Sequence, residues 1–160
     1  MSFVSETIIN EVIESLEGEE ENFLNAIKQL RETQPVLAAY LFSESFNIFT
    51  KEEKDYLLYL CLVIWLSSKR VLKNILPVTE AQLGEQEESN WELLQSASAR
   101  NFRDKLDIFF QEYAQEDLLA FVEDAISDDE DGIVSPEGRE PIFIALKTII
   151  DCLTVDREAV

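Results

Sequence analysis

Apolar residues recur at helical spacing along almost the whole chain, and no stretch alternates apolar and polar residues for long. The first predicted helix carries Ile8, Val12 and Leu16 on one face. Ser5 is a suitable N-cap for this helix, and Gly18 is a suitable end. The hydrophobic pattern therefore predicts helices rather than strands from the start of the chain.

A second and a third helix are predicted on either side of a proline. Phe23 and Leu30 lie on one face of the second helix. This helix should end near Gln34, because Pro35 disfavours helical geometry in the residue before it. Pro35 itself suits the first turn of a third helix, whose apolar residues include Leu37.

The most apolar helix is predicted over residues 51–74. Thr50 and Glu53 form a capping-box pattern at its start, and residues 56–66 are apolar throughout. A helix that is apolar on every side must be surrounded by other elements. We therefore expect this helix at the centre of the core, with Pro77 closing the segment.

Four further helices complete the pattern. The fifth begins at a second capping-box pattern, which starts with Thr79, and the sixth begins near Asn101. Residues 118–126 and 142–153 carry the apolar faces of the seventh and the eighth. A chain of 160 residues suits one domain. The predicted fold is an all-α, compact single-domain bundle of seven to eight helices over residues 1–160.

Two parts of the chain resemble each other, residues 21–75 and residues 100–154. An Asn-Phe pair at residues 22–23 recurs at residues 101–102, and the apolar helices that follow can be aligned. Two three-helix units packed about a pseudo-twofold axis would explain this similarity. Any two amphipathic hairpins would also align in this way, because all helices share periodicity and capping. The sequence leaves both interpretations open.

The composition adds an extreme acidity to this helical pattern. The chain has 33 Asp and Glu against 13 Lys and Arg, a formal net charge of -20, and 46% hydrophobic residues. So many apolar residues predict a folded domain with an acidic surface rather than a disordered acidic tail. Such a surface repels nucleic acid and anionic membranes, and it attracts basic partners or cations.

The acidic residues are concentrated in two segments of the chain. Residues 1–27 contain seven acids and no base, and residues 106–138 contain eleven acids and no base. Two small groups stand out among the basic residues, Lys69, Arg70 and Lys73, and Arg100, Arg103 and Lys105. These cations could hold a phosphate or a partner's carboxylate, but our favoured interpretation is that they compensate helix ends and pair with nearby acids.

The residue types exclude most catalytic and metal-binding chemistry. The chain has no histidine, which is the commonest general base and metal ligand. Its two cysteines, Cys61 and Cys152, fall in apolar helical stretches, as small buried residues do. No glycine-rich phosphate-binding loop is present. We therefore predict a protein that is not an enzyme and needs no cofactor.

Nothing in the sequence predicts a membrane protein. The longest uncharged run, residues 56–68, is shorter than the roughly 18 residues that would indicate a membrane span. The start of the chain lacks the basic region of a signal peptide. We expect a soluble, cytoplasmic protein.

The sharpest local motif is an acidic loop at residues 127–138. Its spacing resembles a calcium-binding loop with Gly132 at the turn. Ser127 and Gly138 stand where that loop needs an Asp and a closing Glu, so we interpret the segment as a solvated loop in which Ser135 caps the next helix. The alternative is a cation site formed by Asp128, Asp129 and Asp131.

Three apolar segments resemble a small bacterial family of acidic proteins that has no assigned activity. They are residues 34–41, 63–65 and 138–147. The resemblance covers most of the chain after residue 20. It implies a compact helical domain and contributes no site residues.

Three hypotheses for function follow from these observations. The first is an acidic protein-interaction module that binds a basic partner protein, as immunity-type proteins and nucleic-acid mimics do. The second is a regulatory protein that binds a cation at the 127–138 loop, or a small ligand there or in a cavity between helices. The third is a helical subunit of a homodimer, paired through apolar surface near residues 51–74. The first fits the charge distribution best, with a monomer or homodimer that binds neither nucleic acid nor membranes.

Overall fold

A computed structural model describes residues 3–127 and 132–155 of the chain. Within these ranges the secondary structure is entirely helical, so the predicted all-α fold is confirmed. The helices are α1 (Glu6–Gly18), α2 (Glu20–Thr33), α3 (Pro35–Leu41), η1 (Glu44–Phe46), α4 (Lys51–Val71), α5 (Glu80–Ser96), α6 (Phe102–Phe110), α7 (Glu116–Ser127), η2 (Pro136–Gly138) and α8 (Arg139–Thr154).

Helices α4 and α5 begin where the sequence places capping residues. Thr50 accepts a hydrogen bond from the Glu53 backbone N–H at 3.1 Å, and the Glu53 carboxylate accepts one from the Thr50 N–H at 2.9 Å. The same reciprocal pair forms between Thr79 and Gln82 at the start of α5. Because the orphan N–H groups of a first turn need such partners, these residues define where the helices start.

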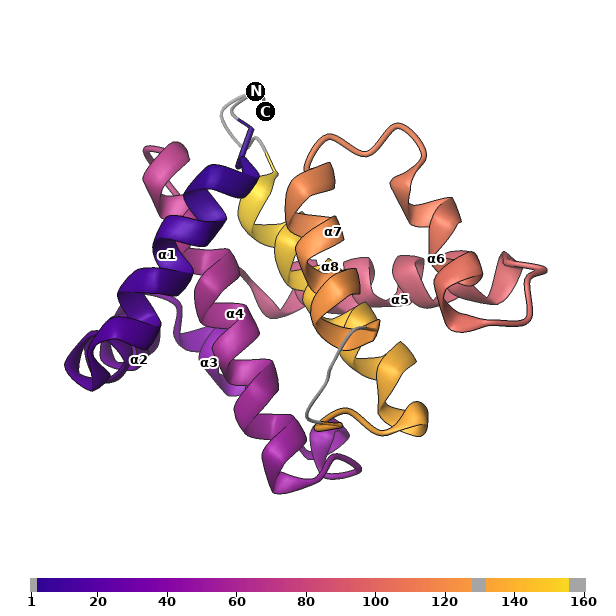
Figure 1. Ribbon diagram of the computed structural model, residues 1–160, viewed down its shortest axis with the longest axis horizontal. Helices are drawn as coiled ribbons and strands as arrows, with labels where there is room; N and C mark the ends of the chain where they lie inside the picture. Colours follow the sequence, from indigo (N-terminus) through magenta and orange to yellow (C-terminus); the bar gives the residue numbers. More distant parts are fainter. Residues whose placement is uncertain (1–2, 128–131, 156–160) are drawn as a thin grey trace.

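Two helices, α4 and α8, form the centre of the molecule. The side chains from Leu60 to Trp65 in α4 are at most 1% exposed, as the sequence predicts for the central helix. Every residue of α8 from Ile142 to Ile150 is also buried. Figure 1 shows α8 crossing the middle of the fold, in contact with α4, α5 and α7. The apolar surface of α4 is thus covered within a single chain.

The end of α4 differs slightly from the prediction. The helix stops at Val71 rather than residue 74, and the next residue is extended. The linker that follows is held by Gln34, whose side chain is 2% exposed. Its amide donates to the Leu76 carbonyl at 3.0 Å and accepts from the Val78 N–H at 2.8 Å. These two bonds fix the connection between α4 and α5 against the α2–α3 junction.

The chain arranges its helices in two groups that meet at the centre. Helices α1 to α4 pack on one another, as do α5 to α8, and the contacts of α1 with α7 and of α4 with α8 join the groups. One continuous cluster of buried side chains extends from Val4 to Leu153. The proposed duplication would equate α2–α4 with α6–α8, and it stays a prediction.

A buried carboxylate ties the start of α4 to the turn before α8. Glu53 is 2% exposed, and its carboxylate accepts hydrogen bonds from the Ser135 N–H at 3.1 Å and the Ser135 hydroxyl at 3.0 Å. A side chain at Gly138 would collide with the same carboxylate oxygen, so only glycine fits there. Burial alone would raise the pKa of Glu53, but the hydrogen bonds from Thr50 and Ser135 outweigh it and lower this pKa below 4.5.

Replacing Glu53→Gln should destabilise the protein near neutral pH. The amide would lose one acceptor oxygen while leaving buried N–H donors unpaired, which costs about 1–3 kcal/mol of unfolding free energy. Because the pKa of Glu53 is lowered by folding, its contribution is present above pH 4.5 and is lost as the pH falls through the folded value. The difference in unfolding free energy between wild type and variant, measured by urea unfolding, should therefore stay constant from neutral pH down to about pH 4.5 and shrink below it.

The control for this prediction is Ser135→Ala, which removes the hydroxyl but keeps the backbone N–H. The variant loses the hydroxyl's bond to Glu53 and the cap bond from the Gly138 N–H. Its loss of stability should still be no larger than that of Glu53→Gln, because the Glu53 carboxylate keeps the backbone N–H donors of Thr50 and Ser135. Equal stability of the Glu53→Gln variant and the wild type at neutral pH would contradict this account.

Candidate functional site

The two acid-rich segments of the sequence come together on one face of the fold. The start of α1 packs against α7, and the two helices diverge from there (Figure 1). Neither helix contains a lysine or an arginine. The sequence separates these helices by about a hundred residues, yet the fold brings Glu6 of α1 together with Asp117 and Asp124 of α7. We call this surface, formed by α1 and α7, the acidic face.

A groove of about 390 Å³ runs between α1 and α7 on the acidic face. Glu6, Asp117 and Asp124 contribute carboxylates to its lining. Ile9 and Phe121 contribute apolar surface, and two alanines of α7 leave room between the helices. The acidic groove therefore combines negative charge with an apolar floor.

Long-range hydrogen bonds fix the two helices relative to each other. The Val4 N–H donates to the buried Gln115 side chain at 3.0 Å, and the Glu6 N–H donates to the Asp117 carboxylate at 3.0 Å. The first turn of α1 is thus held against the first turn of α7. This arrangement leaves the groove preformed rather than dependent on a partner.

Only a few cations neutralise the acidic face. Arg103 pairs with Asp124 at 3.0 Å, and Arg70 pairs with Glu11 at 3.1 Å. All four side chains are substantially exposed, so each pair contributes little to stability and leaves the local charge accessible to a partner.

The basic residues singled out from the sequence do not form one site. Lys69 and Arg70 line a second pocket between α1, α2 and α4, while Lys73 lies in the exposed linker after α4. Lys105 lies 3.6 Å from a carboxylate oxygen of Glu140. Compensation of helix ends and pairing with acids therefore account for several of the cations, as predicted.

The candidate cation ligands Asp128, Asp129 and Asp131 lie outside the described residues. The capping prediction for this segment is confirmed, because the Ser135 hydroxyl accepts a hydrogen bond from the Gly138 N–H at 3.1 Å. Ser135 caps the short η2 turn that leads directly into α8. In residues 3–127 and 132–155, acids and cysteines form no group of three or more that could hold a metal ion.

Both cysteines are buried, as the sequence predicts. Cys61 lies in α4 and Cys152 in α8, and both are free thiols. Burial raises the pKa of the Cys61 thiol to about 12, which keeps it protonated near neutral pH.

Within the described part of the chain, no helix is long and apolar enough to cross a membrane.

A buried polar network around Asp151 was not foreseen from the sequence. The Asp151 carboxylate accepts hydrogen bonds from the Lys147 ammonium at 2.6 Å and from the Tyr113 hydroxyl at 2.6 Å. Gln86 and Asn90 of α5 donate to it as well, at 2.8 and 3.2 Å. Burial, the charge of Asp151 and this hydrogen bond all raise the pKa of Tyr113.

The network holds several helices together. The side chain of Lys147 is only 7% exposed, and its ammonium lies 4.5 Å from the Tyr113 ring centroid and 3.3 Å from the Asn90 side-chain oxygen. A carboxylate, an amide and an aromatic ring thus fix the position of this ammonium. The network joins α5, α8 and the α6–α7 connection. Its sequence signature is a lysine and an aspartate spaced i,i+4 inside an apolar helix.

No protein-family model matches this chain, and neither a curated protein nor a solved structure does.

The two charges of the buried pair should contribute unequally to stability. Asp151→Asn leaves the Lys147 ammonium buried without a counter-charge, so we expect a loss of about 3–5 kcal/mol of unfolding free energy. Lys147→Met leaves Asp151 with its hydroxyl and amide donors, so its loss should be smaller. Urea unfolding of both variants measures the order, and a larger loss for Lys147→Met would contradict this description of the network.

Proposed function

We propose that the protein is an acidic protein-interaction module that binds a basic partner protein through the acidic face. The observation that carries this proposal is that α1 and α7, which both lack lysine and arginine, are neighbours in the fold. Acids spread evenly over a surface would serve solubility alone. Their concentration around a preformed groove favours a role in recognition.

The chemistry of the acidic groove defines the partner. Its carboxylates suit lysine or arginine side chains, and the apolar surface of Ile9 and Phe121 suits a neighbouring aliphatic or aromatic group. A helix or extended segment that presents both a basic and an apolar side chain would fit the groove. Arginine is favoured among the cations, because its planar guanidinium can donate hydrogen bonds to two carboxylates at once.

The net charge of -20 supports the proposal because it should speed association with a basic protein. A field of this sign over the whole molecule steers a basic protein toward the surface and raises the association rate at low ionic strength. Immunity-type proteins and protein mimics of nucleic acid use charge in this way. Binding should therefore weaken steeply as salt is added.

Neutralising the acidic groove should abolish capture of a basic partner. The variant Glu6→Gln, Asp117→Asn, Asp124→Asn keeps side-chain oxygens as acceptors but removes three charges. When the wild-type protein is used as bait in an extract of the native cell at low salt, it should capture a basic protein. The groove variant should bind that protein with an affinity about tenfold lower for each carboxylate neutralised.

The matched control removes three charges from another exposed surface. Glu85, Glu88 and Glu92 of α5 are exposed, and the variant with glutamine at all three has the same net charge as the groove variant. This control should retain capture at nearly the wild-type level. Recovery of no basic protein, or equal losses in the two variants, would contradict the proposal.

A further inference from the structure

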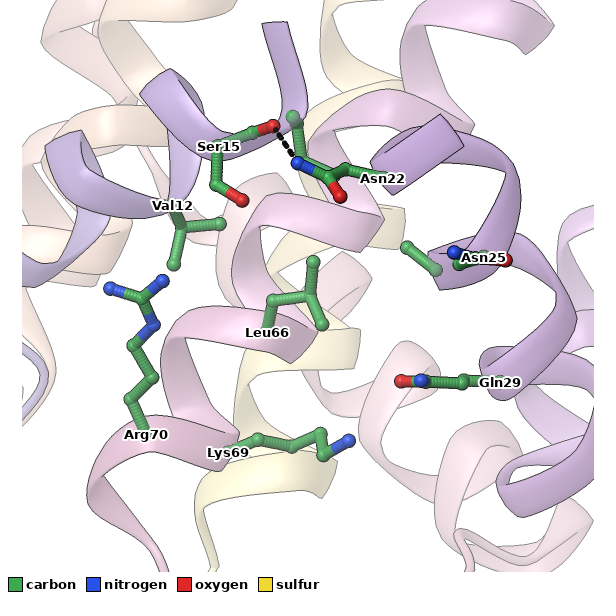
Figure 2. A pocket seen from close by; sticks show the side chains of 10 residues that line it. Val12, Ser15, Asn22, Asn25, Gln29, Leu66, Lys69 and Arg70 are labelled. Carbon is green, nitrogen blue, oxygen red and sulfur yellow. Dashed lines mark hydrogen bonds between the residues drawn. The ribbon is translucent and has the colours of Figure 1, made fainter. Parts of the chain in front are cut away.

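A second pocket, of about 460 Å³, lies between α1, α2 and the end of α4 (Figure 2). Its volume falls in the range of about 300–1,000 Å³ that is typical of small-molecule sites. Buried apolar side chains, including Val12 and Leu16, lie at its base. Apart from Leu66, its remaining lining is polar, and it contains two adjacent cations in a chain that has only 13 among 160 residues. We call this pocket the amide pocket.

The cations of the amide pocket have unused binding capacity. Among the described residues, no carboxylate lies within salt-bridge distance of Lys69, whose ammonium instead lies 4.5 Å from the Trp65 ring centroid. Arg70 uses one terminal nitrogen for Glu11. Lys69 and Arg70 are both exposed, so their remaining donors are open to a ligand in the pocket that they line.

Side-chain amides from α2 complete the polar lining. Asn22 donates to the Ser15 carbonyl at 2.9 Å and so fixes α2 against α1. Asn25 and Gln29 are spaced i,i+4, which places them on one face of α2. Neither of these two amides forms a side-chain hydrogen bond within the described residues. In Figure 2 the side chains of Gln29 and Lys69 extend toward each other.

We propose that the amide pocket binds a small organic anion that carries a carboxylate or a phosphate monoester. Lys69 and Arg70 bind the anionic group, because an ammonium and a guanidinium both form strong charge-assisted hydrogen bonds with such oxygens. Asn25 and Gln29 hydrogen-bond to the hydroxyl or carbonyl groups of the same molecule. This site is separate from the acidic groove, and the two proposals stand or fall independently.

Compensation of the α4 dipole accounts for the cations but not for the pocket. Lys69 and Arg70 occupy the last turn of α4, where positive charge stabilises any helix. That role needs neither a cavity beside them nor unpaired amides on a neighbouring helix. Anion binding must overcome the repulsion of the net charge, so it depends on the local donors and is lost when they are removed.

The direct test is an NMR titration that follows the side-chain amide signals of Asn25 and Gln29. Glycerol 3-phosphate and citrate serve as the phosphate and carboxylate probes, and sodium chloride keeps the ionic strength constant. We expect saturable shifts with at least one probe, and the probe that saturates identifies the anionic group. Glycerol alone, or chloride alone, should produce no saturable shift.

Charge-matched variants separate specific binding from the general effect of charge. Lys69→Gln should weaken probe binding by about tenfold or more, because it removes a charged hydrogen bond. Lys73→Gln changes the net charge equally but lies outside the pocket, so its effect should stay within about twofold. Lys69→Arg, which keeps the cation, should restore most of the affinity.

A second pair of variants tests the amides without touching the cations. Asn25→Asp places a carboxylate in the pocket and should abolish binding, whereas Asn74→Asp in the exposed α4–α5 linker should not. The absence of saturable shifts with both probes would overturn the proposal. Equal effects of Lys69→Gln and Lys73→Gln would overturn it as well.

Discussion

The burial of α8 is the constraint on which the rest of the structure depends. Every side chain from Ile142 to Ile150 is enclosed, so α4, α5 and α7 must all pack against this helix. The enclosed stretch contains Lys147, and a buried charge is tolerated only with a counter-charge and hydrogen-bond partners. Asp151 and the polar side chains of α5 supply them. One buried ion pair thereby fixes the orientation of α5 on α8, and the position of α7 follows from the same packing.

The position of α7 determines where the negative charge accumulates. Once α7 covers one side of α8, α1 packs beside it, and their hydrogen bonds hold the two first turns together. Both helices are amphipathic and turn their apolar residues toward the core, so their acids must face solvent. Self-repulsion among these acids opposes folding. The folded protein keeps these acids close together although their repulsion lowers its stability. A binding role for the charged surface would explain why.

Local features of the sequence predicted much of the fold, but contacts between residues far apart in the chain could not be predicted from it. Thr50, Thr79 and Ser5 define helix starts through bonds within four residues, so their caps were readable from the chain. The contact of α1 with α7 joins residues about a hundred positions apart and leaves no local pattern. The buried ion pair of α8 was missed for a related reason. A lysine and an aspartate at i,i+4 spacing look the same in sequence whether solvent or another helix covers them.

The central claim is that the acidic face, rather than acidity in general, recognises a basic partner. An NMR titration with a lysine-rich amphipathic helical peptide maps the contact directly, with backbone amide shifts of α1, α7 and α5 compared at matched ionic strength. Our account predicts shifts concentrated around the acidic groove, at residues such as Ile9 and Phe121, while the equally exposed acids of α5 remain unperturbed. Shifts of similar size over α5 and the acidic face would contradict it.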